Sequence, residues 1–349
     1  MKDGRDRTVL VIGAGIAGME AALQIGNAGY QVIIVEKEHT IGGTLRSLYS
    51  SFPRWDDPAR LVQMKSEGIK KCGAIEIKTA TVPVSATKQG KGYLVELKDQ
   101  AGIQSKVQAD AVIIATGLEL FDVSAYGEYG YGVYKNVFNT LEFESTLREW
   151  SENRSGSVER PRTVAFIKCV GSRDRSKGYP YCSKICCMIT AKQAGLVRDI
   201  LPDTKCFVFY MDYRASGKEY EEFVRSVIEE KHVRYVRGRP AKVQPEGGRL
   251  VLKVEDTLMG VPVEVRADVV VLAAAMEPSA GTRQMADIFN LETDPYGFIE
   301  PLYGSPARAA ERVFVAGACT FAVETKGAMQ QGAAAAAEVL AVLVTDTGE

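Results

Sequence analysis

The sequence predicts an α/β protein of two doubly wound domains with parallel sheets, the second inserted into the first. Two observations carry this prediction. A strand, a tight glycine turn, a helix and a second strand follow one another in residues 8–36, and the same plan returns in residues 163–210. The length of 349 residues gives room for about two domains of ordinary size.

Composition narrows the class of protein. The formal net charge is −1, so no basic excess points to nucleic acid. The first apolar run, 8–12, ends at once in glycines, and we expect no signal sequence. The longest late apolar stretch, about 333–344, is rich in alanine and interrupted by Glu338, and we expect no transmembrane segment. Seven unevenly spread cysteines favour a reducing, cytoplasmic compartment with metal or redox use over a disulfide framework.

The first strand–turn–helix unit carries a dinucleotide-binding fingerprint. Residues 13–18 read G-x-G-x-x-G between an expected strand at 8–12 and a helix at 16–28, and the strand 31–35 ends in Glu36. The first glycine permits the turn, the second lets the backbone approach a pyrophosphate, and the third lets the helix pack on the strand. The helix N-terminus favours phosphate charge, and an acid can accept hydrogen bonds from a ribose diol. We therefore expect a Rossmann-like dinucleotide site with Gly13, Gly15, Ile16, Ala17, Gly18 and Glu36.

Three further stretches resemble flavoproteins with two dinucleotide-binding domains, such as thioredoxin reductase and glutathione reductase. A Gly-Gly pair follows the ribose acid in 36–44, residues 110–117 end in Ala-Thr-Gly, and Val-Phe-Val-Ala-Gly in 311–319 stands where those proteins carry a Gly-Asp motif. The resemblance implies FAD rather than NAD at this site. It adds the cofactor-binding residues Lys37, Gly43, Thr44, Ala115, Thr116, Gly117, Gly317, Ala318, Lys326 and Gly327.

One position departs from the flavoprotein pattern. The acid that usually follows the last glycine and holds the ribityl chain is Ala318 here, so backbone groups or water would bind the ribityl hydroxyls. The resemblance also places the N-terminus of a C-terminal helix, starting near Lys326, at the flavin pyrimidine. Glu324, Lys326 and Cys319 then become candidate catalytic residues, because a cation or helix dipole there would stabilise a reduced anionic flavin. The alternative for Lys326 is a surface lysine.

The second strand–turn–helix unit holds four of the seven cysteines. An expected strand at 163–168 delivers Cys169 to its C-terminal edge. An expected helix at 184–201, with Ser183 as its N-cap, begins beside the other three, which are Cys182, Cys186 and Cys187. Four thiolates could therefore converge on one point.

An iron–sulfur cluster is the ligand that suits these cysteines best. The adjacent pair at 186–187 fits a single zinc ion badly. A four-thiolate cluster is anionic and favours a helix N-terminus and cationic neighbours. Six lysines and arginines lie between 168 and 192, against Asp174 alone. This chemistry leaves two alternatives for the cysteines, which are a redox disulfide and inert buried thiols.

The same stretch resembles the signature of the A subunits of heterodisulfide reductases. The matching residues are Cys-Val-Gly-Ser-Arg-Asp from 169, Tyr-Cys-Ser-Lys-Ile-Cys-Cys-Met from 181, and then Lys192 and Ala194; the tyrosine–glycine run at 126–134 and the segment 136–144 match as well. The resemblance implies a flavoprotein with a [4Fe-4S] cluster on the four cysteines. That family also tends to lack the ribityl acid, in agreement with Ala318.

The resemblance further implies a function. It is that of an electron-transfer subunit that carries FAD and a [4Fe-4S] cluster in a heterodisulfide-reductase-like complex. The chain has no C-x₂-C-x₂-C run and resembles the short A subunits of sulfur-oxidising bacteria. We therefore expect partner subunits, a sulfur-carrier protein reached through them, a homodimer, and a role in cytoplasmic dissimilatory sulfur oxidation. An NAD(P)H-dependent disulfide oxidoreductase using Cys186 or Cys187, and a non-catalytic assembly subunit, are the alternatives.

The expected domains follow from these motifs. The FAD-binding domain comprises 1–120 and 290–349, a connecting segment covers 121–162 with a polar linker at 151–162, and the inserted module covers 163–289. That module resembles an NAD domain whose phosphate loop is given over to the cluster. The segment 45–61 either covers the flavin or forms a packed excursion. We also expect two strands in 82–98, a strand at 206–210, an amphipathic helix at 217–231, a β-meander at 233–265 and a buried strand at 268–274.

Overall fold

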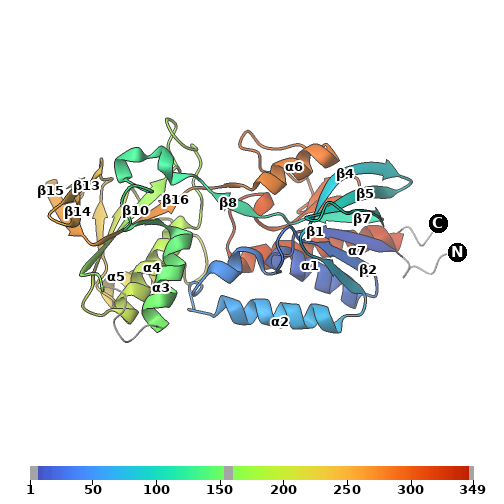
Figure 1. Cartoon of the computed structure of the whole chain (residues 1–349), viewed down its shortest axis with the longest axis horizontal. Helices are drawn as coiled ribbons and strands as arrows, with labels where there is room; N and C mark the ends of the chain where they lie inside the picture. Colours follow the sequence, from blue (N-terminus) through green and yellow to red (C-terminus); the bar gives the residue numbers. More distant parts are fainter. Residues whose placement is uncertain (1–6, 153–159, 346–349) are drawn as a thin grey trace. The chain divides into compact units, whose positions relative to one another are not determined.

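The structure is a computed structural model that describes residues 7–152 and 160–345. It contains two compact units (Figure 1). Unit 1 comprises Met1–Arg46, Ala59–Glu119 and Glu277–Glu349, and unit 2 comprises Ser47–Pro58 and Leu120–Met276. Each unit has a parallel sheet covered on both faces, which confirms the predicted fold class.

A six-stranded sheet forms the centre of unit 1, in the order β18-β19-β7-β1-β2-β3. All neighbouring strands pair in parallel except β18 with β19. The central strands are almost wholly apolar because both faces of the sheet are covered. The strands are β1 (Thr8–Ile12), β2 (Gln31–Val35), β3 (Ile75–Lys78), β7 (Ala111–Ile114), β18 (Arg308–Ala310) and β19 (Val313–Val315).

Helices cover one face of this sheet. α1 (Ile16–Asn27), α2 (Pro58–Lys71) and α7 (Thr325–Thr345) share one core with it. The opposite face packs against α6 (Ala280–Phe289) and an antiparallel sheet. That sheet contains one strand more than the two predicted, namely β4 (Thr81–Gln89), β5 (Gly92–Asp99) and β6 (Gln104–Ala109).

The C-terminal helix α7 is longer than the sequence suggested. It has 21 residues, and an 18-residue window has a mean hydropathy of 1.3, so by length and composition alone it could cross a membrane. Its contacts are those of a core helix. Val339 and Leu343 are buried in the core with α1, and a Cβ on Gly332 would lie 2.4 Å from the carbonyl oxygen of Ala17. We assign α7 to the core of unit 1.

Unit 2 is built on a five-stranded sheet in the order β12-β11-β10-β16-β9, and every neighbouring pair is parallel. α3 (Thr140–Glu152), α4 (Cys186–Ile200) and α5 (Tyr220–Glu229) cover one face. An antiparallel sheet of β13 (Val243–Glu246), β14 (Arg249–Asp256) and β15 (Val261–Ala267) covers the other. The central strands are β9 (Val137–Asn139), β10 (Thr163–Val170), β11 (Lys205–Tyr210), β12 (Arg234–Arg237) and β16 (Val269–Ala274).

The remaining elements are short. The chain leaves unit 1 at β8 (Leu118–Leu120) and returns at β17 (Met276–Pro278), and these two strands pair with each other. The single-turn 3₁₀ helices are η1 (Gly43–Ser47), η2 (Val123–Ala125), η3 (Gly127–Tyr129) and η4 (Gly317–Cys319).

Several predicted boundaries were wrong. The segment 121–152 does not stand apart, because β9 pairs with β16 and α3 packs in the core of unit 2. β12 joins the parallel sheet instead of the meander expected at 233–265. α6 packs on unit 1, so the inserted unit ends at Met276 and not at 289. Most of the expected linker, 153–159, lies outside the described residues.

The segment 47–58 packs on unit 2 through named contacts. The Lys192 ammonium donates to the Ser50 carbonyl at 2.8 Å. The ring of Trp55 lies 4.9 Å from that of Phe223, and the Arg54 guanidinium donates to both oxygens of Glu219. Of the two expectations for 45–61, the packed excursion agrees with these contacts.

Candidate functional site

The glycine loop of unit 1 has room for a ligand beside its second glycine. A Cβ on Gly13, which has φ +104°, would lie 2.4 Å from the Ala115 carbonyl oxygen, and one on Gly18 would lie 2.0 Å from the Gly13 carbonyl oxygen. Those two glycines are therefore required by the fold itself. A Cβ on Gly15 would meet nothing within 4 Å. This open cradle is the space that a pyrophosphate needs at such a loop.

The N-terminus of α1 and the side chain of Glu36 border the cradle. Gly15 is the N-cap of α1 and, within the described part of the chain, no side chain caps this helix. Its first N–H groups are thus left for an anion. The buried Glu36 carboxylate accepts hydrogen bonds from the backbone N–H groups of Ala14, at 2.8 Å, and Glu38, at 3.0 Å. It is held against the loop and keeps acceptor capacity for a ribose diol.

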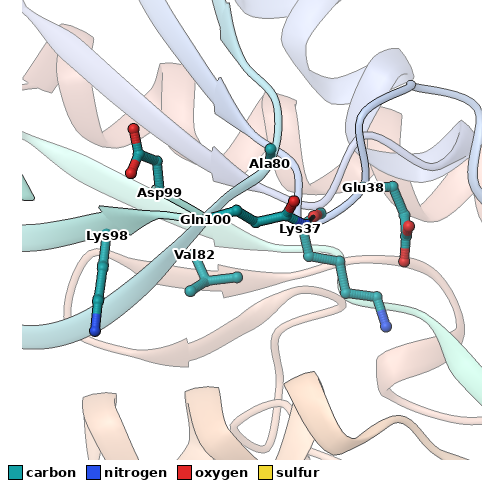
Figure 2. A pocket seen from close by; sticks show the side chains of 7 residues that line it. All are labelled: Lys37, Glu38, Ala80, Val82, Lys98, Asp99 and Gln100. Atoms are coloured by element: carbon teal, nitrogen blue, oxygen red, sulfur yellow. Dashed lines mark hydrogen bonds between the residues drawn. The ribbon is translucent and has the colours of Figure 1, made fainter. Parts of the chain in front are cut away.

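A pocket of about 370 Å³ follows directly on Glu36 (Figure 2). Lys37 and Glu38 come from the loop after β2, Ala80 and Val82 from the start of β4, and Lys98, Asp99 and Gln100 from the end of β5. The backbone N–H of Thr81 donates to the Glu36 carbonyl, and that of Ala80 to the Glu38 carbonyl. Ala80 and Val82 are the apolar residues of this pocket, and the other five lining residues are polar or charged, a mixture that suits a planar base next to a ribose.

The structure brings several of the predicted flavin residues to the same loop. A Cβ on Gly43 would lie 3.0 Å from the Gly15 Cα, and one on Gly317 would lie 2.8 Å from the Ala17 Cβ. With Ala115 beside Gly13, segments from four parts of the chain meet there. Ile16 is buried at the start of α1, while Lys37 and Thr44 are exposed.

Other predicted flavin residues lie at the edges of this group. Thr116 and Gly117 face the start of α6, where the Thr116 hydroxyl hydrogen-bonds to that of Thr282 at 2.7 Å and the Gly117 carbonyl accepts from the same hydroxyl. Ala318 lies half-buried in η4, and Gly327 lies in the first turn of α7.

The three candidate catalytic residues have different surroundings. Lys326 is exposed in the first turn of α7, and Glu324 immediately precedes that helix. Cys319 is 0% exposed, and its thiol donates to the carbonyls of Ile114 and Ala316 at 3.3 Å each. Burial raises the pKa of Cys319 to about 12. These surroundings are those of a core thiol and do not support a reactive Cys319, while the roles of Lys326 and Glu324 stay predictions.

Three of the four predicted cluster cysteines meet at the C-terminal edge of the unit 2 sheet. Cys169 lies near the end of β10, and Cys186 and Cys187 are the first two residues of α4. All three are buried, and the Cys186 thiol hydrogen-bonds to the sulfurs of both others. Cys182 is half-buried on the intervening loop. Within residues 7–152 and 160–345, no group of three or more His, Cys, Asp or Glu is arranged to hold a metal ion, so the expected convergence of all four is not seen.

The backbone at Cys169 is in an unusual conformation. Its φ is +60°, and the pairing of β10 with β16 shifts register between Ile167 and Val170. A bulge of this kind re-aims a side chain at the end of a strand. Left-handed backbone at a non-glycine residue costs about 1–3 kcal/mol and is concentrated at functional sites. Arg173 and Lys184, on the loop between the cysteines, are left-handed as well.

Cationic and N–H groups surround the cysteine sulfurs. The backbone N–H of Arg214 donates to the Cys187 sulfur at 3.3 Å. Hydrogen bonding from the Cys186 thiol lowers the pKa of Cys187 and of Cys169, and Lys168 lowers both further. Lys168 is 3% exposed and donates to the Asp212 carbonyl at 3.2 Å. The site therefore stabilises negative charge on sulfur.

The loop between Cys169 and Cys182 is fastened by two tyrosines of the run at 126–134 and by Arg239, which no sequence motif singled out. The Tyr126 hydroxyl donates to Asp174 at 2.6 Å, and the Tyr126 ring stacks on Tyr129 at 5.8 Å. The Arg239 guanidinium lies 5.1 Å from the Tyr126 ring centroid and donates to the Tyr129 hydroxyl. The tyrosine–glycine run was a visible signal in the sequence, but no local pattern linked it to Arg239.

Proteins of known family align with most of the length of this chain. Residues 7–157 match the family described as pyridine nucleotide-disulphide oxidoreductase. Among the iron-sulfur A subunits of CoB–CoM heterodisulfide reductases, that of Methanocaldococcus jannaschii is 32% identical over 380 residues, covering 85% of this chain and 58% of that protein. One from Methanopyrus kandleri is 30% identical over 426 residues, covering 98% of this chain and 65% of that protein. The chain thus spans roughly three fifths of the length of these relatives.

Solved structures agree on the fold. Thioredoxin reductase of T. acidophilum has a TM-score of 0.67 at 18% identity, covering 97% of this chain and 99% of that chain. LpdA of Mycobacterium tuberculosis has a TM-score of 0.67 at 14% identity, covering 96% of this chain and 72% of that chain. At such identities the likeness shows the fold alone.

Proposed function

We propose that this chain, which is similar to the A subunits of heterodisulfide reductases over 85% to 98% of its length, is a flavin-dependent oxidoreductase subunit that transfers electrons between FAD and one [4Fe-4S] cluster. The FAD site would be in unit 1 and the cluster in unit 2. Since each site lies within one unit, each can be argued and tested by itself.

The observation that carries the proposal is what occupies one strand–helix turn in each unit. In unit 1 that turn is the open glycine cradle between β1 and α1. In unit 2 the corresponding turn runs from β10 to α4 and holds Cys169, Cys182, Cys186 and Cys187. The turn that carries the glycine cradle in unit 1 carries four cysteines in unit 2. Soft thiolate ligands select iron–sulfur clusters, zinc or copper(I) over the hard cations.

The residues present fit a cluster in chemistry, although they are not gathered into a four-ligand site. Three buried sulfurs lie in hydrogen-bond contact. Lys168 favours the anionic form of Cys169 and Cys187, and the Arg214 N–H favours that of Cys187. Cys182 lies just before α4, on the loop that Tyr126 and Arg239 fasten through Asp174. We propose that this cysteine completes the set.

The residues around the glycine cradle fit FAD. Gly15 leaves room for a pyrophosphate, and the first N–H groups of α1 would hold its charge. Glu36 would orient the ribose, and the pocket lined by Lys37, Ala80 and Val82 would take the adenine. When bound, a flavin and an iron–sulfur cluster together would convert an electron pair into single electrons. The chain's own part is to bind, to orient and to set the charge around each group.

The setting of this activity is part of the proposal. We propose that the protein works in the cytoplasm within a heterodisulfide-reductase-like complex, as a homodimer, in dissimilatory sulfur oxidation, and that a sulfur-carrier protein is reached through partner subunits. The relatives named as heterodisulfide reductase subunits support partner subunits. The sulfur-oxidation role is carried over from the resemblance to the A subunits of sulfur-oxidising bacteria.

One observation favours a second function, an NAD(P)H-dependent disulfide oxidoreductase. The sulfurs of Cys169, Cys186 and Cys187 lie in direct hydrogen-bond contact, as a dithiol that forms a disulfide requires. In that function NAD(P)H would reduce the flavin, and the reduced flavin would give two electrons and two protons to an S–S bond, which breaks to leave two thiols.

Anaerobic purification separates the two functions. We expect flavin released on denaturation to be FAD, with about four iron and four acid-labile sulfide per chain after reconstitution. Cys182→Ala is the diagnostic variant because Cys182 takes no part in the contacts among the other three sulfurs. Loss of iron in Cys182→Ala supports the cluster. No iron in the wild type, together with reversible loss of two titratable thiols, would replace it with the disulfide function.

A further inference from the structure

The hydroxyl of Tyr235 is a buried donor whose role the fold leaves open. Its oxygen is inaccessible to solvent and has no hydrogen-bond partner in the described part of the chain. Leaving such a group unpaired destabilises a folded protein, and each case in a native protein calls for an explanation. An absent ligand that accepts a hydrogen bond is one explanation.

The position of Tyr235 brings it to the cysteine site. Tyr235 lies in β12 and pairs with Val208 of β11. Both belong to the core on the α4 face of the sheet. Two residues along β11, the ring of Tyr210 lies 5.5 Å from that of Tyr235, and the Lys168 ammonium lies 5.5 Å from the Tyr210 centroid. Tyr235 is thus part of the wall beside the N-terminus of α4.

Tyr235 is linked to the surroundings of Cys187 through Tyr213, whose ring lies 6.5 Å from that of Tyr235 and which directly precedes Arg214. Burial raises the pKa of Tyr235 well above its usual range. The hydroxyl therefore keeps its proton and can only serve as a donor toward an anion. Cys187 receives a hydrogen bond from the Arg214 N–H, yet the Tyr235 hydroxyl has no recorded partner among the described residues.

We propose that the Tyr235 hydroxyl donates a hydrogen bond to a sulfur of the iron–sulfur cluster, on the side held by Cys187, and so raises the reduction potential of that cluster. This inference rests on the proposed function. The structure leaves this donor unpaired because its acceptor arrives with the cluster.

The electrostatic consequence has a definite sign. One-electron reduction of a cluster adds one negative charge and makes or breaks no bond. A donor aimed at sulfur stabilises the more negative, reduced state, so hydrogen bonds raise the potential. Removing one such hydrogen bond should lower the ratio of reduced to oxidised cluster by about two- to tenfold at a fixed ambient potential.

The test compares Tyr235→Phe with the wild type in two states. In the reconstituted protein, an anaerobic redox titration followed by electron paramagnetic resonance should give a more negative midpoint for Tyr235→Phe, with unchanged iron content. In the cluster-free protein, thermal unfolding should show Tyr235→Phe to be no less stable than the wild type, because the hydroxyl has no hydrogen bond to lose there.

Tyr213→Phe is the matched control, since the Tyr213 ring lies 6.5 Å from the Tyr235 ring and Tyr213 is 40% exposed. This variant should change neither the midpoint potential nor the melting temperature.

Each outcome decides a different claim. An unshifted midpoint in Tyr235→Phe, or a cluster-free variant that melts at a lower temperature than the wild type, overturns the role of Tyr235 while the cluster stands. A wild-type protein that binds no iron and sulfide on reconstitution overturns the proposed function and this inference with it. An equal shift in Tyr213→Phe would assign the effect to the aromatic wall and not to the hydroxyl.

Discussion

At the scale of single residues, the glycines of the loop 13–18 serve two different purposes. Gly13 and Gly18 are needed because a Cβ at either would collide with backbone. The fold itself does not require a glycine at position 15, because a Cβ there would enter open space and the φ of −71° suits any residue. Only a ligand bound in the cradle would exclude a side chain at this position. One motif thus combines a folding requirement with a binding requirement.

This difference predicts two outcomes from the same kind of substitution. Gly15→Ala should fold and melt like the wild type without flavin but bind FAD about tenfold to a hundredfold more weakly, since a methyl group in the cradle costs about 1–3 kcal/mol. Gly18→Ala should lose stability before any ligand is added. Flavin titration and thermal unfolding of both variants measure this, and tight FAD binding by Gly15→Ala would show that no pyrophosphate lies there.

The cysteines give the second prediction at this scale. Cys169→Ala or Cys182→Ala should lose most of the iron while retaining FAD, because the flavin residues lie in unit 1 and the cysteines in unit 2. Cys206→Ala and Cys72→Ala are the controls. Cys206 is a core thiol whose pKa is raised by burial to about 12, and Cys72 lies beside Gly26 in unit 1. Iron analysis and flavin absorbance decide the matter, and full iron in every variant would refute the ligand assignment.

At the scale of elements, one buried ion pair fastens the segment 47–58 to α3 and α4. The Lys192 ammonium donates to Glu144 at 2.7 Å and to the Ser50 carbonyl, and the other Glu144 oxygen accepts from the Tyr49 N–H at 2.9 Å. The side chains of the pair are 2% and 1% exposed. Burial lowers the pKa of Lys192, and the charge of Glu144 opposes that shift. Because α4 begins with Cys186, this pair also anchors the helix that presents the thiols.

Breaking the pair should destabilise unit 2 strongly. Lys192→Met leaves Glu144 as an uncompensated buried charge and should cost about 3–5 kcal/mol, whereas Lys192→Met combined with Glu144→Leu should recover part of that loss. The exposed pair Arg225–Glu221 is the control, and Arg225→Met should cost less than about 1 kcal/mol. The two tryptophans, Trp55 and Trp150, both lie in unit 2, so their fluorescence reports its unfolding. Equal effects of Lys192→Met and Arg225→Met would contradict the anchoring role.

At the scale of the whole molecule, the two units share one architecture but present different ligand chemistry. Unit 1 keeps the open glycine cradle, while unit 2 carries cysteines in the equivalent turn. A nicotinamide cofactor needs its own pyrophosphate site, normally a glycine loop at a helix N-terminus. Within the described residues, unit 2 offers Gly171 at that turn but no G-x-G-x-x-G run.

NADH and NADPH should therefore reduce the isolated protein poorly, and electrons should enter through partner subunits. Anaerobic stopped-flow mixing with excess NADH measures the rate at which the flavin absorbance is lost. Bleaching at roughly 1 to 1,000 per second, the range of ordinary enzyme turnover, would contradict partner dependence and favour the disulfide oxidoreductase. Arg173 lies on the cysteine loop, where it is already in an ion pair with Asp212. A phosphate would therefore bind weakly to Arg173, and slow reduction of the flavin by NADH is compatible with the proposal.

The sequence by itself determined the fold class, the glycine cradle with Glu36, and the strand–loop–helix that carries the cysteines. These features are local. Glycine spacing, β-branched runs and cysteine spacing are each decided within about 30 residues, the length of one strand–helix–strand unit. The same locality explains why β1 and β2 were found to the residue and β10, β11 and α4 within two residues of the predicted ends.

Only the tertiary structure decided which distant residues meet. It placed β9 and β12 in the sheet of unit 2, packed 47–58 against α4, buried Cys319, and left the buried Tyr235 hydroxyl without a hydrogen-bond partner among the described residues. Each of these depends on contacts between residues far apart in the chain, as with Lys192 and Glu144. A periodic pattern along the sequence reports which face of an element is buried, but it carries no information on the partner that buries it.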